Sequence, residues 1–417
     1  MNTMFGIRLT VPWMILLVIS GLSCIFMMQI LYVQKIYTSV TGNKCEKKDD
    51  SSIQQCANSA SKIHSFAEKV LNKDRRVLQA ESFEHIRVSN ENQCKDRKFL
   101  VYRCDSSIGC GGWADRQKGI VSTFLMALLT KRVFVIDMTR PCKLDQFMLP
   151  NTYDWSVCQS YIKSVPNRLT GTFNHIEDYK FATVVNHFDF ERVWTKRVIF
   201  IRFHTHAIDG LRQHDEAKSR FKWLLNMTNE DVIHVVLNTL FQPSDKIIND
   251  AIEFHDNRIG EKKLMCCHIR KGRNPSIPED NNLRFGPPNE TVIFDFLKNY
   301  DRKSDYLIYI ASDSEEVKQS ARNHFSSYIN INRTIVHVDR LGTFRNLKTE
   351  ACNGLYSVIL EQLILSLCDE LVLTRSGLGT FAAYMRGIAE GLFLYHPTEK
   401  RIVTTNLTNI QKVFHFL

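Results

Sequence analysis

A short basic segment follows a run of apolar residues in the second half of the chain. The run at 264–269 is apolar enough for a buried β-strand, and His268 lies near its end. Arg270, Lys271 and Arg273 then place three cations within four residues. Side chains at the carboxyl end of a parallel strand point into the crevice where ligands bind, and such cations suit a diphosphate. The alternative is a solvated loop, with His268 as an ordinary core histidine.

A glycine-containing loop follows a second apolar run, at 370–374. Ser376, Gly377, Gly379 and Thr380 precede a helical pattern rich in alanine. Glycines let the backbone approach a ligand, the first amide groups of a helix have no intrahelical acceptor, and hydroxyl groups add donors. The loop therefore predicts a phosphate-binding turn.

Asp313 lies between two serines after a third apolar run, 306–311, and is followed by Glu315 and Glu316. Serine and glutamate at such positions are typical of helix capping, which is one interpretation. In the other interpretation, the Asp313 carboxylate contacts the ribose or base of a nucleotide.

An earlier loop matches a different ligand pattern. Gly109, Gly111 and Ala114 fit the glycine spacing of dinucleotide-binding loops, and Asp137 ends the next strand-like run. A nicotinamide or flavin oxidoreductase is therefore an alternative. However, Asp137 follows Gly109 by 28 positions, whereas about 20 is usual. A tight turn between a strand and a helix also explains the glycines, and we favour a loop that shapes a sugar-binding cleft.

The charged residues do not indicate a metal-bound nucleotide or a nucleic acid. No two aspartates are separated by a single residue, so the chain lacks the D-x-D pattern that holds a divalent cation in many sugar transferases. Lys and Arg number 54 against 44 Asp and Glu, a net charge of +10, but they are dispersed and form no nucleic-acid-binding motif. We expect cations and helix termini to neutralise a diphosphate without a metal or other cofactor.

Apolar runs alternate with helical patterns along most of the chain, which predicts an α/β protein. Strands at 99–102 and 133–136 flank a helix, and a later helix that opens at Ser244 and closes near Gly260 leads into the second half. We expect two Rossmann-like domains with a cleft between them. Their bounds are 98–258 and 259–417. The strands expected in the second domain are 264–269, 306–311, 334–338, 370–374 and 391–395, and its helices are 291–299, 315–325, 355–368 and 379–388.

The N-terminal residues predict a membrane anchor. The run 9–34 holds 26 residues without a charge, which is long enough to span a bilayer, between a short tail, 1–8, and a polar stem, 35–97. Lysines after the run favour a cytosolic head. In contrast, 11 of the 12 cysteines and four Asn-x-Ser/Thr sequons follow the run and favour an oxidising lumen, which is our interpretation. The sequons begin at Asn226, Asn289, Asn332 and Asn406.

Together these motifs resemble the GDP-fucose transferase superfamily, which includes α1,6-, plant xyloglucan α1,2- and protein O-fucosyltransferases. The early segment is most similar to the xyloglucan-type branch, although Ala114, Asp115 and Arg116 stand where that branch usually has Gly-Asn-Arg. This departure leaves the acceptor open. The resemblance covers roughly 99–417 and rests on segments 111–116, 121–130, 268–270, 312–314 and 376–379.

The resemblance implies a GT-B arrangement of two Rossmann-like domains that uses GDP-fucose with inversion and without a metal. By that likeness, Arg270 holds the β-phosphate and assists the leaving group. The loop 376–380 holds the phosphates, while Asp313 and His268 line the nucleotide pocket.

We therefore predict a single-pass type II Golgi membrane protein whose lumenal head transfers fucose from GDP-fucose to a glycan hydroxyl. Glu279 and Asp280, in a polar loop, are the candidates for the base that the acceptor needs. Asp115 and Arg116 are expected to orient the acceptor from the first domain. The alternatives are a non-catalytic lumenal glycan-binding protein of the same fold and, less favoured, a dinucleotide-dependent oxidoreductase.

Overall fold

The chain divides into two units after Leu71, and the second unit, Asn72–Leu417, contains all three described β-sheets. The expected anchor at 9–34 lies outside the residues that the structure describes. Within the described ranges, no helix is both long enough and apolar enough to cross a membrane. The computed structural model describes Val70 and residues 76–175, 179–272, 286–333, 336–338 and 348–414.

The first sheet contains four parallel strands in the order β2-β1-β5-β4. Strands β1 (Phe99–Cys104), β2 (Val133–Met138) and β5 (Val198–Phe203) are almost completely buried, which explains their continuous apolar sequence. Strand β4 (Thr170–His175) lies at the edge and is partly exposed. Because β2 pairs on one side of β1 and β5 on the other, the strand order reverses at β1.

Helix α3 (Trp113–Leu129) packs tightly against this sheet. Its approach depends on Gly119, because a Cβ there would lie 1.6 Å from the carbonyl oxygen of Phe203 at the end of β5. One turn later, the Ser122 hydroxyl donates to the carbonyl of Thr205 at 3.0 Å. The helix therefore fixes the backbone that follows β5.

Short helices complete the first half and lead to the second. Strands β3 (Met148–Pro150) and β6 (Phe241–Pro243) form a small antiparallel pair. As expected, a helix begins after Ser244; it continues as a π-helical turn, His255–Ile259, before Gly260. The helices are α4 (Gln159–Ser164), α5 (Tyr179–Val184), α6 (Phe190–Val193), α7 (Ile208–Gln213), α8 (Asp215–Arg220), α9 (Lys222–Asn226), α10 (Asn229–Leu240) and α11 (Asp245–Phe254).

The end of the expected stem is part of the folded head instead. Residues 80–96 contain three short 3-10 helices, and Phe83 and Ile86 beside them are fully buried. Cys94 forms a disulfide with Cys158 of the first half. Buried apolar side chains and a cross-link hold this segment against the head, so a stem that extends to residue 97 is too long.

In the described part of the chain, the second sheet has six strands in the order β12-β11-β10-β7-β8-β9, of which only β12 is antiparallel to its neighbour. The chain runs from β7 to β8 and β9 on one side and then returns to β10 and β11 on the other. The order therefore reverses between β7 and β10, as in a doubly wound Rossmann sheet. The strands are β7 (Lys263–Ile269), β8 (Tyr306–Ser312), β9 (Tyr328–Ile329), β10 (Glu370–Leu373), β11 (Leu392–His396) and β12 (Arg401–Thr404).

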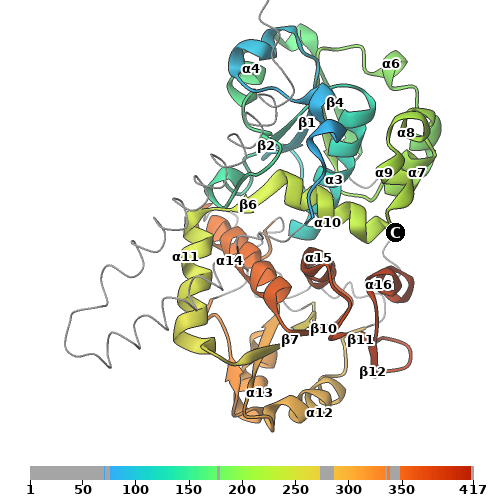
Figure 1. The fold of residues 1–417 in the computed structure, drawn as a ribbon. Coiled ribbons are helices and arrows are strands. Elements are labelled where there is room, and N and C mark those ends of the chain that lie inside the picture. Colours follow the sequence, from blue (N-terminus) through green and yellow to red (C-terminus); the bar gives the residue numbers. More distant parts are fainter. Residues whose placement is uncertain are drawn as a thin grey trace, which may run out of the picture. The chain divides into compact units, whose positions relative to one another are not determined.

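Several described helices accompany the second sheet, and α14 packs along α15 (Figure 1). The strand expected at 334–338 is wrong in its described part, because residues 336–338 are not in a strand. The neighbour of β8 is β9 instead. Val336 and Val338 are nevertheless buried, which gives this segment the apolar pattern of a strand. The helices are α12 (Glu290–Asp301), α13 (Glu315–His324), α14 (Lys348–Leu367), α15 (Gly377–Arg386) and α16 (Leu407–Phe414).

Buried contacts join the two halves besides the chain itself. Trp113 of α3 donates from Nε1 to Gln362 of α14 at 2.7 Å, and Gln117 exchanges hydrogen bonds with the same amide. A disulfide joins Cys142 of the first half to Cys352 of α14. The two halves are therefore cross-linked as well as packed against each other.

Disulfide bonds are confirmed within the described residues, where eight cysteines are paired and buried Cys267 is free. The disulfide pairs are Cys94–Cys158, Cys104–Cys110, Cys142–Cys352 and Cys266–Cys368.

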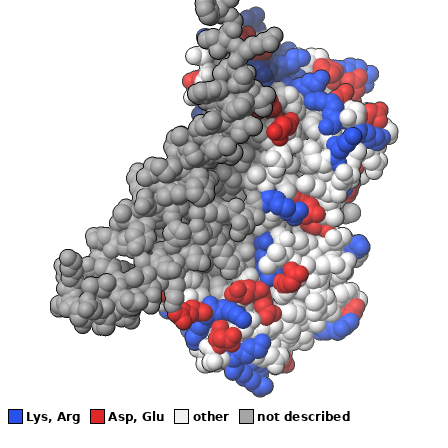
Figure 2. All heavy atoms as spheres, viewed as in Figure 1, with Lys and Arg blue, Asp and Glu red and all other residues white. Residues whose placement is uncertain are grey.

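On the face shown in Figure 2, basic and acidic side chains are interspersed, in agreement with the dispersed positive charge of the sequence.

Candidate active site

The loops that follow β7 and β10 meet where the strand order of the second sheet reverses. Thr374, directly after β10, ties them together: its hydroxyl donates to the carbonyl of His268 and accepts the backbone N–H of Arg270, both at 2.9 Å. In open α/β sheets this is the place where ligands bind. The basic turn and the glycine-containing loop, which are separated by about a hundred residues in the sequence, therefore form one site.

Asp313 holds the basic turn in place. Its carboxylate accepts the backbone N–H groups of Lys271 and Gly272, at 2.7 and 2.8 Å, and pairs with the guanidinium of Arg270 at 2.5 Å. The side chain is only 7% exposed. The expectation that Asp313 contacts a ribose or base does not agree with this geometry, because the carboxylate is already used to position Arg270.

Lys271 points its ammonium group toward α12, where it forms an ion pair with Glu290. Both side chains are partly buried. Binding of a diphosphate by Lys271 stays a prediction, and it requires that the lysine exchange this carboxylate for phosphate oxygens.

The glycine loop begins helix α15, with Ser376 at the N-cap. The Ser376 side chain makes no capping bond, and the buried hydroxyl of Thr380 has no partner among the described residues. Gly377 touches the first half, since a Cβ there would lie 2.8 Å from the Cβ of Ala114. Gly379 covers His268, whose Nδ1 would be 3.1 Å from an added Cβ. Unused donors and a tightly packed backbone are what a phosphate-binding turn needs.

His268 lies beneath this loop and is 4% exposed. Burial lowers the pKa of His268 to about 4, while the charge of Asp313 acts in the opposite direction. The histidine is therefore neutral at physiological pH, and its Nδ1 has no partner among the described residues. It forms the floor of the site rather than one of its cations.

Glu361 of α14 is a residue that sequence reasoning missed. It is 2% exposed, and its Oε2 has no hydrogen-bond partner among the described residues. Burial raises the pKa of Glu361 to about 7; Lys318 acts against this rise and Asp313 adds to it. A single acidic residue in the apolar run of α14 was the available signal, because an unpaired carboxyl group is rarely buried without a function.

Titration of Glu361 should make the stability of the protein depend on pH. The folded-state pKa, about 7, exceeds the ordinary value of 4.5, so wild type should lose stability relative to Glu361→Gln as the pH rises from 4.5 to 7. The expected loss is about 3 kcal/mol. His268 acts in the opposite direction, so only the difference between the two proteins isolates Glu361. Urea unfolding at several pH values measures it, and a difference that does not vary with pH would contradict the assignment.

In the first half, Asp115 lies in the first turn of α3 and closes the early glycine loop. Its carboxylate accepts the N–H of Gly112 at 3.1 Å and pairs with Lys118 at 3.0 Å. Burial would raise the pKa of Asp115, but Lys118 outweighs it and the pKa is lowered. Asp115 is therefore an anion beside Gly111, whose φ of 76° favours glycine.

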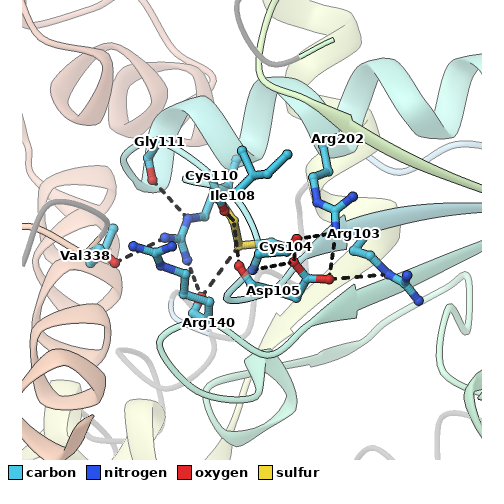
Figure 3. Close-up of a disulfide and its surroundings, with 11 residues drawn as sticks. Arg103, Cys104, Asp105, Ile108, Cys110, Gly111, Arg140, Arg202 and Val338 are labelled. Carbon is cyan, nitrogen blue, oxygen red and sulfur yellow. Dashed lines mark hydrogen bonds and ion pairs between the residues drawn. A yellow bond between two sulfur atoms is a disulfide. The ribbon is translucent and has the colours of Figure 1, made fainter. Parts of the chain in front are cut away.

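The loop before Asp115 is cross-linked and anchored (Figure 3). The Cys104–Cys110 disulfide closes it, and Arg202 pairs with Asp105 at 2.7 Å. Burial alone would raise the pKa of Asp105, but hydrogen bonds from Arg202 and Ser107 lower it to about 2. The loop is therefore held by both covalent and ionic bonds.

Arg116 is buried between the halves and does not face an acceptor. Its guanidinium donates to the carbonyl groups of Gly111, Arg140 and Val338, at 3.1, 2.6 and 3.2 Å. The expectation that Arg116 orients the acceptor is therefore replaced by a structural role, because a fully buried guanidinium that donates to three carbonyls ties three loops together.

The geometry around Asp137 does not support the oxidoreductase alternative, which requires this carboxylate to bind a ribose. Asp137 pairs with Arg103 Nε at 3.0 Å, and that guanidinium also stacks on the ring of Phe200. A carboxylate held in this way is not available for the ribose of a dinucleotide, as the alternative requires.

The other expected residues are exposed or lie outside the described chain. Glu279 and Asp280 fall in 273–285, which the structure does not describe, so their role as the base stays a prediction.

Among the described ranges, no group of three or more His, Cys, Asp or Glu is placed to hold a metal ion. The sequon asparagines are all exposed: Asn226, Asn289, Asn332 and Asn406.

Comparison with known proteins gives similar structures but no similar sequence. No protein-family model matches the chain, and no curated protein matches it. A mutant of Arabidopsis thaliana FUT1 in complex with GDP has a TM-score of 0.49 at 14% identity, over 81% of this chain and 78% of that one. The fucosyltransferase NodZ from Bradyrhizobium has 0.49 at 10%, over 75% and 99%. POFUT1 in complex with GDP has 0.40 at 11%, over 71% and 97%.

These structures are fucosyltransferases, the class that the motifs of this chain resemble. With TM-scores below 0.5 and such low identities, we base the function on this chain's own residues.

Proposed function

We propose that this protein is a glycosyltransferase that transfers fucose from GDP-fucose to a glycan hydroxyl, with inversion and without a metal. The observation that carries the proposal is the Arg270 guanidinium, held by Asp313 where the second sheet reverses its order and beside the first turn of α15. The choice of fucose rests on the resemblance of the motifs.

In this proposal, Arg270 and the amide groups of α15 stabilise the diphosphate as it leaves. The bond between the fucose C1 and the β-phosphate oxygen breaks, and GDP departs with the electron pair while negative charge develops on that oxygen. A planar guanidinium with several donors matches two phosphate oxygens at once. Because Asp313 fixes Arg270 before the substrate arrives, little reorganisation is needed during the reaction.

The buried carboxyl group of Glu361 suits a guanine base. Guanine presents two adjacent N–H donors, and Glu361 Oε2 is a buried acceptor without a partner in the described chain. Leaving such an acceptor unsatisfied is costly, so a donor from the ligand is favoured. In this proposal Glu361, rather than Asp313, recognises the base.

The proposed cellular location rests on sequence features at the N-terminus and on the head. We propose a type II Golgi membrane protein with a lumenal head, supported by the uncharged run 9–34, the four disulfides and the four exposed sequon asparagines. Endoglycosidase treatment should shift the mobility of the protein. If the protein carried no glycan and protease digested its head in intact microsomes, the orientation would be reversed.

The decisive experiment is transfer from GDP-fucose to an array of glycans, with and without EDTA. We expect binding of GDP, transfer of fucose and no loss after chelation, because cations and helix amides meet the charge of the diphosphate. GDP-mannose serves as the matched donor control. Binding of GDP without transfer to any glycan would favour the non-catalytic alternative. Loss of transfer in EDTA with recovery in manganese would disprove the metal-free mechanism.

A further inference from the structure

The loop after β5 brings a histidine to the end of the first sheet where its strand order reverses. His204 follows Phe203, the last residue of β5. Two contacts fix its backbone: Phe203 packs on Gly119, and the Ser122 hydroxyl donates to Thr205 and accepts the N–H of Ala207 at 3.2 Å. A site residue held by a strand and a helix in this way keeps a defined position.

His204 and Asp115 converge on the same point. The Nδ1 atom of His204 and the Oδ2 atom of Asp115 lie 2.9 and 3.0 Å from the position that a Cβ on Gly111 would take. The Nδ1 atom is buried and has no hydrogen-bond partner among the described residues. Gly111 therefore leaves the space in which an imidazole and a carboxylate approach each other.

This pair lies close to α15 of the second half. Ala114, the residue before Asp115, is the one that Gly377 of the phosphate loop touches. His206, two residues after His204, stacks on Phe381 of α15 with ring centroids 6.2 Å apart. The β5 loop thus borders the helix whose first turn is proposed to hold the diphosphate, so an acceptor between the halves reaches both.

We propose that His204 is the general base that removes the proton of the acceptor hydroxyl, with Asp115 stabilising the imidazolium that forms. This inference rests on the proposed function. The acceptor O–H proton passes to the imidazole, the acceptor oxygen forms a bond to the fucose C1, and GDP leaves with the electron pair. Among the described residues, Asp115 of α3 interacts electrostatically with His204, and Lys118 of the same helix acts on both Asp115 and His206.

His206 does not fit this role. Burial lowers the pKa of His206 to about 3, and its ring packs on Phe381. The side chains of His204 and His206 are both partly exposed, so the contact with Phe381 and the lowered pKa are what set His206 apart. The proposed base therefore lies in the first half, whereas Glu279 and Asp280 belong to the second.

His204→Ala in the full-length protein tests the proposal. We expect transfer to glycan to fall roughly 100- to 10,000-fold, with GDP affinity unchanged by calorimetry and partial recovery on addition of imidazole. A structural role would give no recovery by imidazole. His187→Ala, which removes an exposed histidine of the same half, is the matched control and should keep wild-type transfer.

Two further variants separate the possible outcomes. If His204→Ala does not fold, His204→Gln keeps a similar volume and must show the same loss of transfer. The double variant Glu279→Gln with Asp280→Asn tests the competing base that the sequence predicts. Wild-type transfer by His204→Ala or His204→Gln, or loss confined to the double variant, would overturn the proposal. Absence of GDP binding by wild type would instead refute the proposed function.

Discussion

Replacement of Arg270 by alanine or lysine is expected to lower fucose transfer roughly 100- to 1000-fold while the protein stays folded. Arg270 is held by Asp313 and by its backbone bond to Thr374, so its donors are aimed before the substrate binds. Lysine carries the same charge but lacks the planar fork of donors, and a single ammonium group cannot contact Asp313 and two phosphate oxygens with the same geometry. Steady-state transfer rates and GDP affinity are the measurements.

The control for Arg270 is an exposed arginine of the same half. Arg302 lies at the end of α12 and should tolerate alanine with little change in transfer. Asp313→Asn should resemble Arg270→Ala in part, because it removes the carboxylate that positions the guanidinium. If Arg270→Ala retained both transfer and GDP affinity, the nucleotide site would not lie at the ends of β7 and β10.

Replacement of Gly119 by alanine should prevent folding or lower the free energy of unfolding by more than about 3 kcal/mol. The added methyl group would lie 1.6 Å from the carbonyl oxygen of Phe203 and 2.7 Å from the ring of Tyr102. The carbonyl belongs to a buried central strand, so no change of side-chain rotamer relieves the clash, and overpacking of this kind exceeds the usual cost of about 1–3 kcal/mol. Yield of folded protein and urea unfolding are the readouts.

Gly112→Ala is the matched variant, because it adds the same methyl group at the start of the same helix. The nearest atom would be Asp115 Oδ2 at 3.6 Å, an ordinary contact, and the φ of −65° is open to any residue. We expect a change of less than about 1 kcal/mol. Equal stability of Gly119→Ala and wild type would mean that α3 does not pack on β5 as closely as described.

Local patterns in the sequence were sufficient for much of the fold. Continuous apolar runs predicted β7, β8, β10 and β11 because strands of a parallel sheet covered on both faces are apolar at every position. Glycine after a strand predicted the loop that begins α15. The segment at 336–338 failed because its valines are buried without pairing in a strand. An apolar pattern reports burial, whereas pairing depends on neighbouring strands.

The donor-side residues were found from the sequence, but their roles were decided by the tertiary structure. Arg270 was identified because cations after a strand suit a diphosphate. Asp313 was assigned to the ligand, yet it binds Arg270 and two backbone N–H groups from a segment 41 to 43 residues earlier. Similarly, Arg116 stood in a motif, yet it is buried among the carbonyls of three loops.

Glu361 and His204 are the converse case, because the sequence did not indicate them and the structure did. Neither belongs to a motif that the sequence singled out, and each became a candidate only because its surroundings are known. For Glu361 the decisive fact is burial without a partner, and for His204 it is the space that Gly111 leaves beside Asp115. The sequence by itself determined which strands, turns and charges exist, since these depend on neighbours in the chain. Only the tertiary structure decided which charged groups contact each other and which polar groups stay without a partner, because the neighbours of these groups come from distant segments of the chain.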